Sequence, residues 1–307
     1  MTQAKVTALR SVEIGAANLA QVVEFYGGTF GLRQVATDNR VVLLRGTDAA
    51  HHALAIHPAP YPCLVRIVFE AADKAAVDEL HKRVADWLGL AIEQPAELKR
   101  ADGGYGFGFK DVEGRNFAVI CDAREHTPEA HDALRPTKLS HVNLNSADHA
   151  RSVEFLQKAL GFELRDETKI MCFMGCSADH HSLVIAKSGG PTLNHISFEM
   201  PDLEAVMIGT GRLVDAGYPI EWGIGRHGPG NNSFAYFAGP EEFPIEYCSE
   251  MQQVDSEYGF KGPDEWAWPP GRVDQWGVGT NPTKRLKRIQ SMIQFSVDGY
   301  RLHSAGS

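Results

Sequence analysis

The sequence repeats itself once, at an interval of about 130 residues, and this repeat limits the fold more than any other feature. Four pairs of segments occur in the same order in both copies: VEF at 23–25 and 153–155, HHALAI at 51–56 and HHSLVI at 180–185, LVRIVFEAAD at 64–73 and LNHISFEMPD at 193–202, and FKDVEGRNFAVIC at 109–121 and FAGPEEFPIEYCS at 237–249. The offset drifts only from 130 to 128. This period is far too long for a solenoid, so the repeat predicts a duplicated domain.

Each copy has the same order of expected elements. LSHVNL at 139–144 alternates apolar and polar residues, as a strand with one buried face does. Residues 146–162 then carry capping residues, an apolar helical face and Gly161 as a stop, which predict a helix. Three β-rich segments follow, with a further helix among them. The sequence therefore predicts an α+β fold of tandem βαβββ modules that form two curled-sheet domains.

The repeat also sets the expected domain boundaries. We expect an N-terminal domain at 1–128, a C-terminal domain at 137–255 and a C-terminal extension at 256–307. The extension holds three of the five tryptophans, so we expect it to pack on the domains. It could line a pocket mouth, shape an oligomer interface or cap the second domain.

Composition excludes several classes of function. A formal net charge of −9 argues against a nucleic-acid partner, because phosphate binding relies on clustered Lys and Arg. No apolar run approaches the roughly 18 residues of a membrane helix, and the first ten residues lack the apolar stretch of a signal peptide. The five cysteines are odd in number and mostly far apart, which favours reduced thiols. We therefore expect a cytoplasmic protein without membrane contact.

The two copies differ most at three strand positions. The second copy has His141, His195 and Glu246 where the first has Ser11, Arg66 and Ala118. Two imidazoles and one carboxylate on three strands of a curled sheet can converge as a facial triad, the ligand pattern of non-haem Fe(II) oxygenases. A lone histidine is more often a surface or hydrogen-bonded residue. Three ligand-type residues, all absent from the partner copy, favour a metal site in the second domain and none in the first.

Beyond these positions, the chain resembles the type I extradiol ring-cleavage dioxygenases of the vicinal oxygen chelate superfamily, over nearly its whole length. The segments that carry the resemblance are SHVNL, HHSLVI, NHISFEM and GIGRHGPGNNSFAYF with the later PIEY. The resemblance implies His141, His195 and Glu246 as metal ligands and His181, His227 and Tyr236 as catalytic residues, with His180 as the alternative to His181. One departure is the turn GPEEFPIE at 239–246, which lacks the glycine of the usual DPxGxxIE.

The function implied by this resemblance is extradiol (meta) cleavage of a catechol-type ring in aromatic catabolism. The expected cofactor is Fe(II), with Mn(II) as the alternative because both accept these ligands. The expected substrates are a catechol and O2, and a homo-oligomer is expected. A base must take a phenolic proton and an acid must return one, which suits the imidazole of His181. His227 and Tyr236 would hydrogen-bond the substrate or oxygen-derived groups.

Two rival functions use the same fold. A glyoxalase-type isomerase or lyase would use Zn or Ni in a site that takes two ligands from each domain, which Ser11 and Ala118 cannot supply. A non-catalytic binding protein would have no need for a full ligand triad. Metal binding without oxygen uptake would favour these two readings.

Overall fold

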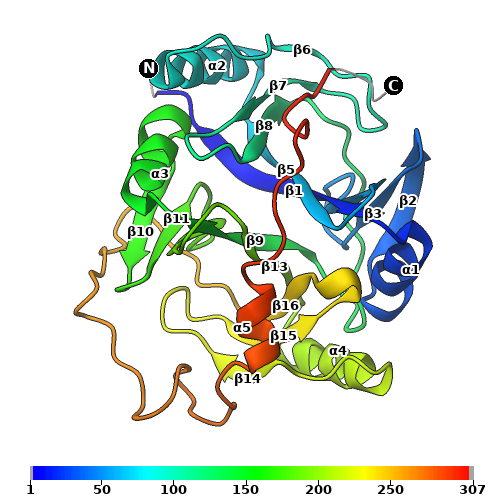
Figure 1. Ribbon diagram of the computed structural model, residues 1–307, viewed down its shortest axis with the longest axis vertical. Coiled ribbons are helices and arrows are strands. Elements are labelled where there is room, and N and C mark those ends of the chain that lie inside the picture. Colours follow the sequence, from blue (N-terminus) through cyan, green and yellow to red (C-terminus); the bar gives the residue numbers. More distant parts are fainter. Residues whose placement is uncertain (1–2, 304–307) are drawn as a thin grey trace.

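The computed structural model describes residues 3–303, and the chain folds into two halves that each contain an eight-stranded sheet (Figure 1). The N-terminal half contains β1 (Val6–Ala16), β2 (Arg33–Asp38), β3 (Val41–Arg45), β4 (Leu54–Pro58), β5 (Cys63–Ala71), β6 (Ala96–Glu97), β7 (Tyr105–Lys110) and β8 (Asn116–Cys121). The C-terminal half contains β9 (Lys138–Ser146), β10 (Glu163–Glu167), β11 (Met171–Gly175), β12 (Leu183–Lys187), β13 (Leu193–Glu199), β14 (Trp222–Arg226), β15 (Ser233–Ala238) and β16 (Pro244–Ser249).

The two sheets have the same topology. Their strand orders are β2-β3-β4-β1-β5-β8-β7-β6 and β10-β11-β12-β9-β13-β16-β15-β14. In each half the first strand of one βαβββ module pairs antiparallel with the first strand of the next, β1 with β5 and β9 with β13. Each of these strands also pairs in parallel with the last strand of its own module. The predicted tandem βαβββ fold is confirmed.

Four helices lie where the repeat predicts them, and a fifth, α5, lies in the C-terminal extension. They are α1 (Leu19–Glu24), α2 (Lys74–Leu88), α3 (His149–Phe155), α4 (Leu203–Asp215) and α5 (Lys284–Ile289), and α1 and α3 continue into the π-helical turns η1 (Phe25–Thr29) and η2 (Leu156–Leu160). The Asp148 side chain caps α3, and η2 ends at Gly161 in the left-handed conformation, at φ 78°. No helix within residues 3–303 is long and apolar enough to cross a membrane.

Each half holds the start of a helix in the other half. Glu113, in the turn between β7 and β8, accepts hydrogen bonds from the backbone N–H groups of residues 147 and 148, at 2.8 and 3.1 Å, just before α3. Glu241, in the short 3₁₀ turn η3 (Pro240–Glu242) before β16, accepts from residues 17 and 18, just before α1. Glu242, which occupies the position of Gly114, takes a φ of 63° where Gly114 takes 82°, and Glu241 beside it is also positive at 56°. The turn that lacks the usual glycine is therefore formed with glutamate residues instead.

The halves share one hydrophobic core. A single cluster of buried side chains includes residues from both sheets and from all four sheet-covering helices. At one end the ring of Trp87 in α2 lies 5.3 Å from that of Phe155 in α3, and at the other Phe25 lies 4.6 Å from Tyr218, which follows α4. Both sheets therefore pack against one another through shared apolar side chains.

The C-terminal extension contacts both halves. Leu286 and Ile289 of α5 are fully buried against the aromatic side chains of β15. The chain then crosses to the N-terminal half, where Leu64 donates a backbone hydrogen bond to Gln294 at 2.8 Å and Ser296 donates one to Leu64 at 2.9 Å. Figure 1 shows this segment, in red, running from α5 past β13 and β1 toward β7.

Candidate metal centre

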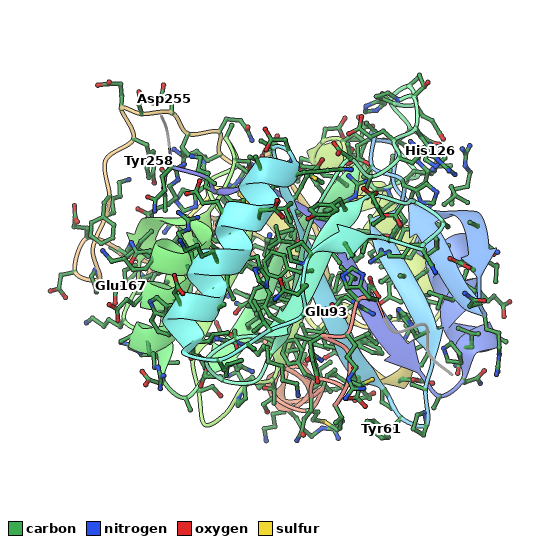
Figure 2. All side chains as sticks on the ribbon, turned by 90° about the horizontal axis from the view of Figure 1, so that it is seen from above. Tyr61, Glu93, His126, Glu167, Asp255 and Tyr258 are labelled. Atoms are coloured by element: carbon green, nitrogen blue, oxygen red, sulfur yellow. The ribbon has the colours of Figure 1, made fainter. Side chains whose placement is uncertain are left out.

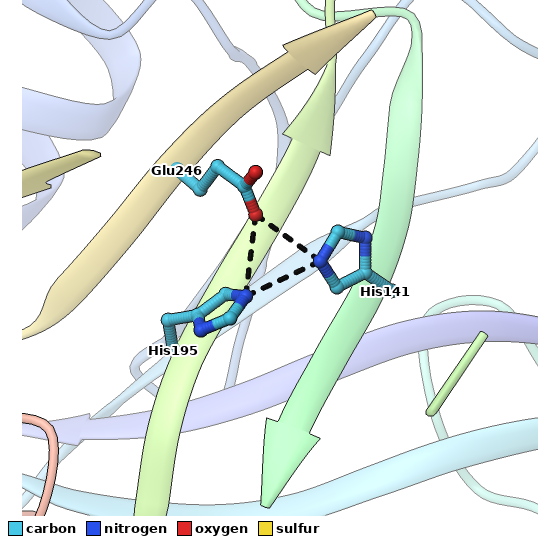
Figure 3. Close-up of side chains that lie close together, drawn as sticks. All are labelled: His141, His195 and Glu246. Carbon is cyan, nitrogen blue, oxygen red and sulfur yellow. Dashed lines mark hydrogen bonds and ion pairs between the residues drawn. The ribbon is translucent and has the colours of Figure 1, made fainter. Parts of the chain in front are cut away.

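His141 of β9, His195 of β13 and Glu246 of β16 meet at one point in the C-terminal half (Figure 3). The two Nε2 atoms lie 3.2 Å apart, and they lie 3.1 and 3.2 Å from Oε2 of Glu246. The strand register brings them together, because Ser197 of β13 lies opposite His141 on one side and Glu246 on the other. All three side chains are buried. We call the sheet face that carries them the site face.

The contacts of Glu246 fit a metal ligand better than an ordinary ion pair. Within residues 3–303, no N–H group is directed at either of its buried carboxylate oxygens with hydrogen-bond geometry, although imidazole nitrogens lie within 3.2 Å. Burying an ionised carboxylate without hydrogen-bond donors or a cation raises the free energy of the folded state. A cation at the common point would satisfy both imidazoles and the carboxylate together, and two nitrogens with one oxygen suit Fe(II) or Mn(II).

The local electrostatics favour the ligating forms. Burial alone would raise the pKa of Glu246, but the neighbouring His141, His195 and His227 hold it well below its usual range. Burial lowers the pKa of His195 to about 4, despite the opposing effect of Glu246. At neutral pH the carboxylate is therefore ionised and the His195 imidazole is neutral, as metal coordination requires.

A polar network orients His195. The Oδ1 atom of Asn194 lies 2.9 Å from Nδ1 of His195, and it also accepts a hydrogen bond from Gln290 at 3.0 Å. The Asn194 amide donates to Oδ1 of Asn145 at 3.1 Å. Because Oδ1 only accepts, Nδ1 of His195 carries the proton and Nε2 keeps a free lone pair. The sequence analysis missed Asn194, although it directly precedes His195, and nothing in the sequence pointed to Gln290.

His180 and His181 have different surroundings. Nε2 of His180 lies 2.7 Å from Oδ2 of Asp166, and its Nδ1 lies 3.0 Å from Nδ1 of His181. The carboxylate makes Nε2 of His180 the protonated nitrogen, so Nδ1 of His180 accepts from Nδ1–H of His181. This leaves Nε2 of His181 unprotonated, and the His181 ring lies 4.5 Å from that of His141. His181 therefore borders the metal ligands, and His180 stands behind it.

Burial makes His181 neutral. Its pKa lies well below the usual value, first because the side chain is buried and then because His141, His180 and His227 are close. The backbone of Gly230 covers the same imidazole: a Cβ atom on this residue would lie 2.7 Å from Cε1 of His181. Gly230 also has a φ of 78°, which side chains rarely adopt. The glycine-rich loop thus forms one wall beside His181.

His227 and Tyr236 lie on another side of the ligands. Nε2 of His227 is 3.0 Å from the Tyr236 hydroxyl and 3.4 Å from Oε1 of Glu246, and the hydroxyl is 3.5 Å from Nε2 of His195. Tyr236 lies directly opposite Glu246 in the β15–β16 register. Burial first, and then Glu246, raise the pKa of Tyr236 well above its usual value, so its hydroxyl stays protonated. Both residues can donate hydrogen bonds beside the ligands.

A cavity of about 970 Å³ adjoins His227, and its lining comes in equal parts from residues 226–252 and from the C-terminal extension. Trp266 and Trp276 line it, with Lys261 Nζ 5.1 Å from the centre of the Trp266 ring and the Arg226 guanidinium 4.7 Å from the Trp276 ring. Trp276 is 42% exposed, so the extension does not bury all its tryptophans in a core. The extension therefore contributes side chains to a cavity that also reaches His227.

A family model described as the Glyoxalase/Bleomycin resistance protein/Dioxygenase superfamily matches residues 138–247, the part of the chain that carries the three ligands. The solved structure of the Mn(II)-bound glyoxalase from Novosphingobium aromaticivorans is 32% identical, with a TM-score of 0.86 over 92% of this chain and 94% of that chain. This chain belongs to the glyoxalase/bleomycin resistance protein/dioxygenase superfamily.

Two curated relatives are named as a metapyrocatechase and an extradiol dioxygenase. Metapyrocatechase 2 of Cupriavidus necator is 31% identical over 151 residues, which are 46% of this chain and 45% of that protein. The iron-dependent extradiol dioxygenase of Rhodococcus jostii RHA1 is 27% identical over 228 residues, 66% of this chain and 76% of that protein. The match thus spans less than half the length of metapyrocatechase 2. The Rhodococcus protein is named as iron-dependent and the Novosphingobium structure as Mn(II)-bound, and the donor set here suits either metal.

The N-terminal half keeps the superfamily fold without the ligands. Val68 of β5 occupies the position of Ser197, and it lies opposite Ser11 of β1 on one side and Ala118 of β8 on the other. Nearby, the buried Glu13 accepts from Arg66 at 3.0 Å and from Arg100 at 3.1 Å. Ion pairs therefore occupy the sheet face that corresponds to the site face.

The C-terminal extension fills the rest of this equivalent face. Leu302 packs in a small apolar cluster that includes Val68 and Ala118. Gly108 lies opposite Ala118, as Tyr236 lies opposite Glu246, and a Cβ atom on Gly108 would lie 1.8 Å from the carbonyl oxygen of Tyr300. Glu93, labelled in Figure 2, accepts from the backbone of both Gly108 and Leu302. The N-terminal half therefore has no room for a substrate at this position.

Proposed function

We propose that this protein is an extradiol dioxygenase that uses Fe(II) and O2 to open a catechol-type ring beside its two hydroxyls. The observation that carries the proposal is the position of His181: a neutral imidazole with a free nitrogen borders a buried His₂–Glu set. His227 and Tyr236 lie on another side of the same His₂–Glu set. The chain thus combines a proton acceptor and two hydrogen-bond donors with the ligands of a redox-active metal.

Iron is the expected occupant of the ligand set, with Mn(II) as the alternative. His141, His195 and Glu246 would hold it, and they leave adjacent coordination positions open. When bound, Fe(II) supplies the one-electron chemistry that allows O2 to react with a closed-shell aromatic ring. The naming of one relative as iron-dependent and another as Mn(II)-bound supports both metals.

The residues around the ligands would manage protons and exclude water. His181 would take a proton from a catechol hydroxyl at Nε2, while its Nδ1–H stays bonded to His180 and Asp166 holds His180. Tyr236 and His227 would donate hydrogen bonds to negative charge that develops on substrate oxygen atoms. The side chains of His180, His181 and Tyr236 are buried, and that of His227 is 20% exposed. Electrostatic interactions are stronger in such a water-poor site.

The ring substituent would extend past His227 into the cavity. Its tryptophan faces and its two cationic side chains, Arg226 and Lys261, favour a substituent that is flat or carries a carboxylate. Arg226 is already paired with Glu250, so Lys261 is the better partner for such a group. A catechol with a bulky or acidic substituent is therefore the expected class of substrate.

The test is oxygen uptake by protein that has been reconstituted anaerobically with Fe(II), using a panel of catechols with small, bulky and acidic substituents. We expect uptake that matches the appearance of a ring-opened chromophore, and its loss in His141→Ala. The matched control is Ser11→Ala, which changes the equivalent position of the N-terminal half and should leave uptake intact. Metal bound through the triad without uptake from any catechol would contradict the proposal.

A metal-dependent isomerase or lyase is the second candidate. It is favoured by the 32% identity to a protein described as a Mn(II)-bound glyoxalase. Against it, all three ligands here come from the C-terminal half, and Ser11 and Ala118 offer none from the other. Turnover of an α-ketoaldehyde thiol adduct with Mn(II), Zn(II) or Ni(II), without oxygen consumption, would replace the dioxygenase proposal with this one.

A further inference from the structure

A second group of metal-ligating side chains lies outside the site face, at the edge of the C-terminal sheet. It consists of His149, the first residue of α3, Glu167, the last residue of β10, and Cys172 of β11. One ligand atom from each residue lies within 4.8 Å of the others. None of the three contacts the catalytic ligands, so their proximity needs an explanation of its own.

The local structure brings these three residues together. Glu167 and Cys172 lie directly opposite each other in the β10–β11 pair, so their side chains share one face of the sheet. The first turn of α3 lies over that face and adds His149. Cys172 is buried, whereas His149 and Glu167 are partly exposed, and Figure 2 shows Glu167 at the periphery of the molecule. An ion could therefore reach the group from solvent.

The N-terminal half shows that the fold does not require these residue types. Thr37 lies opposite Val42 in the β2–β3 pair, and Leu19 is the first residue of α1. The same three positions thus hold Leu, Thr and Val in one half and His, Glu and Cys in the other. Packing alone is satisfied by the first set, and the second set places a thiol, a carboxylate and an imidazole together at a cost in desolvation.

We propose that His149, Glu167 and Cys172 form a second divalent-metal site, separate from the catalytic one and selective for Zn2+. Thiolate, imidazole and carboxylate are the three ligand types that zinc prefers, with bonds of roughly 2.0–2.3 Å. Such bonds place neighbouring ligand atoms roughly 3.3–3.8 Å apart, so modest side-chain rotations would close the site. Cys172 would release its proton to solvent on binding, and water would occupy the fourth position.

Bound zinc would join the start of α3 to the β10–β11 hairpin. The backbone just before α3 is already held by Glu113 of the other half. The β10–β11 hairpin also carries Asp166, which orients His180 behind His181. The second site would therefore stabilise the part of the C-terminal half that supports the acid–base histidine pair, without touching the reacting groups.

The test uses Co2+ as a spectroscopic substitute for Zn2+ in the full-length protein. A thiolate bound to Co2+ produces an intense near-ultraviolet charge-transfer band, and His141, His195 and Glu246 include no thiol, so the band reports on the second site alone. We expect one equivalent of the band per chain, its loss on addition of one equivalent of Zn2+, and its retention in His195→Ala. Absence of the band from the unmodified protein would overturn the proposal.

The N-terminal half supplies the matched variants. Cys172→Val, His149→Leu and Glu167→Thr each introduce the residue that packs at the equivalent position, so we expect normal folding by circular dichroism. Cys172→Val should abolish the band, and the other two variants should weaken Co2+ binding at least tenfold. Cys121→Ala, which removes a buried thiol of the other half, should leave it unchanged. A band that survives in both His149→Leu and Glu167→Thr would reduce the site to a single thiol and contradict the proposal.

Discussion

The two halves have the same sheet, register and helices, but they fill equivalent faces in opposite ways. The C-terminal half places two imidazoles and an unpaired carboxylate on its site face. The N-terminal half places the Glu13 ion pairs and Leu302 of the extension there. The difference teaches that one sheet face can either carry a set of metal-ligand side chains or be filled permanently by ion pairs and by the extension.

The largest expected effect on activity comes from replacing Glu246 with alanine, the residue at the equivalent position of the N-terminal half. Glu246→Ala copies Ala118, and it should abolish stoichiometric iron binding and reduce ring cleavage to background, because two imidazoles alone hold iron weakly. Metal content by mass spectrometry and oxygen uptake would show this. The reciprocal change, Ala118→Glu, should gain no metal and should destabilise the protein, because the new carboxylate would be buried among apolar side chains.

His181 and His52 occupy equivalent positions, and only one of them borders metal ligands. His181→Asn should lower kcat by roughly 100- to 10,000-fold while metal content stays unchanged, because it removes the proposed proton acceptor and none of the proposed ligands. His52→Asn should leave kcat within about twofold, since Arg100 is the neighbour of the His52 ring. Equal losses in the two variants would show that the pair of histidines is structural in both halves.

Glu13 tests how far the N-terminal half depends on its ion pairs. In the described part of the chain, Glu13 is the only buried carboxylate that pairs with Arg66 and one of the two that pair with Arg100, which keeps Asp102. Glu13→Gln should lower the free energy of unfolding by about 3–5 kcal/mol with metal content retained. Burial alone would raise the pKa of Glu13, but Arg66, Arg100 and His57 hold it well below its usual range. Its contribution to stability is therefore present above about pH 4.3 and is lost as the pH falls. Urea unfolding at several pH values should show a shallower loss on acidification in the variant than in the unmodified protein.

Asn194 tests the support of a ligand rather than the ligand itself. Asn194→Val introduces the residue found at the equivalent position, Val65, and it removes the acceptor that fixes the proton on Nδ1 of His195. Iron affinity should fall roughly 10- to 100-fold, while the fold is retained. A chelator competition with Fe(II) would measure this change. An unchanged affinity would mean that the strand register alone orients His195.

Much of the architecture could be predicted because the repeat is long and ordered. The alternation in LSHVNL and the stop at Gly161 are local signals, and the structure confirms the strand and the helix that they predict. His141, His195 and Glu246 could be proposed together because their counterparts are not ligands. The structure brings these three side chains to one point, and it places His227 and Tyr236 beside them.

Other features depend on contacts that no local pattern records. The sequence could not separate His180 from His181, because the distinction comes from Asp166 on another strand. The supporting roles of Asn194 and Gln290 also arise only when the extension returns to β13. Tryptophan content predicted packing for the extension, yet Trp276 lies at a cavity mouth, and the apolar contact of the extension with the other half comes from Leu302.

The exchange of turns between the halves limits how such a protein can evolve. Glu113 and Glu241 each close the helix entry of the other half, so neither half presents a complete set of backbone partners when it is alone. A gene fragment that encodes only the metal-bearing half would lose the acceptor for the residues before α3. The N-terminal half can therefore lack metal ligands and still be needed, because it supplies the acceptor at the start of α3 in the half that carries them.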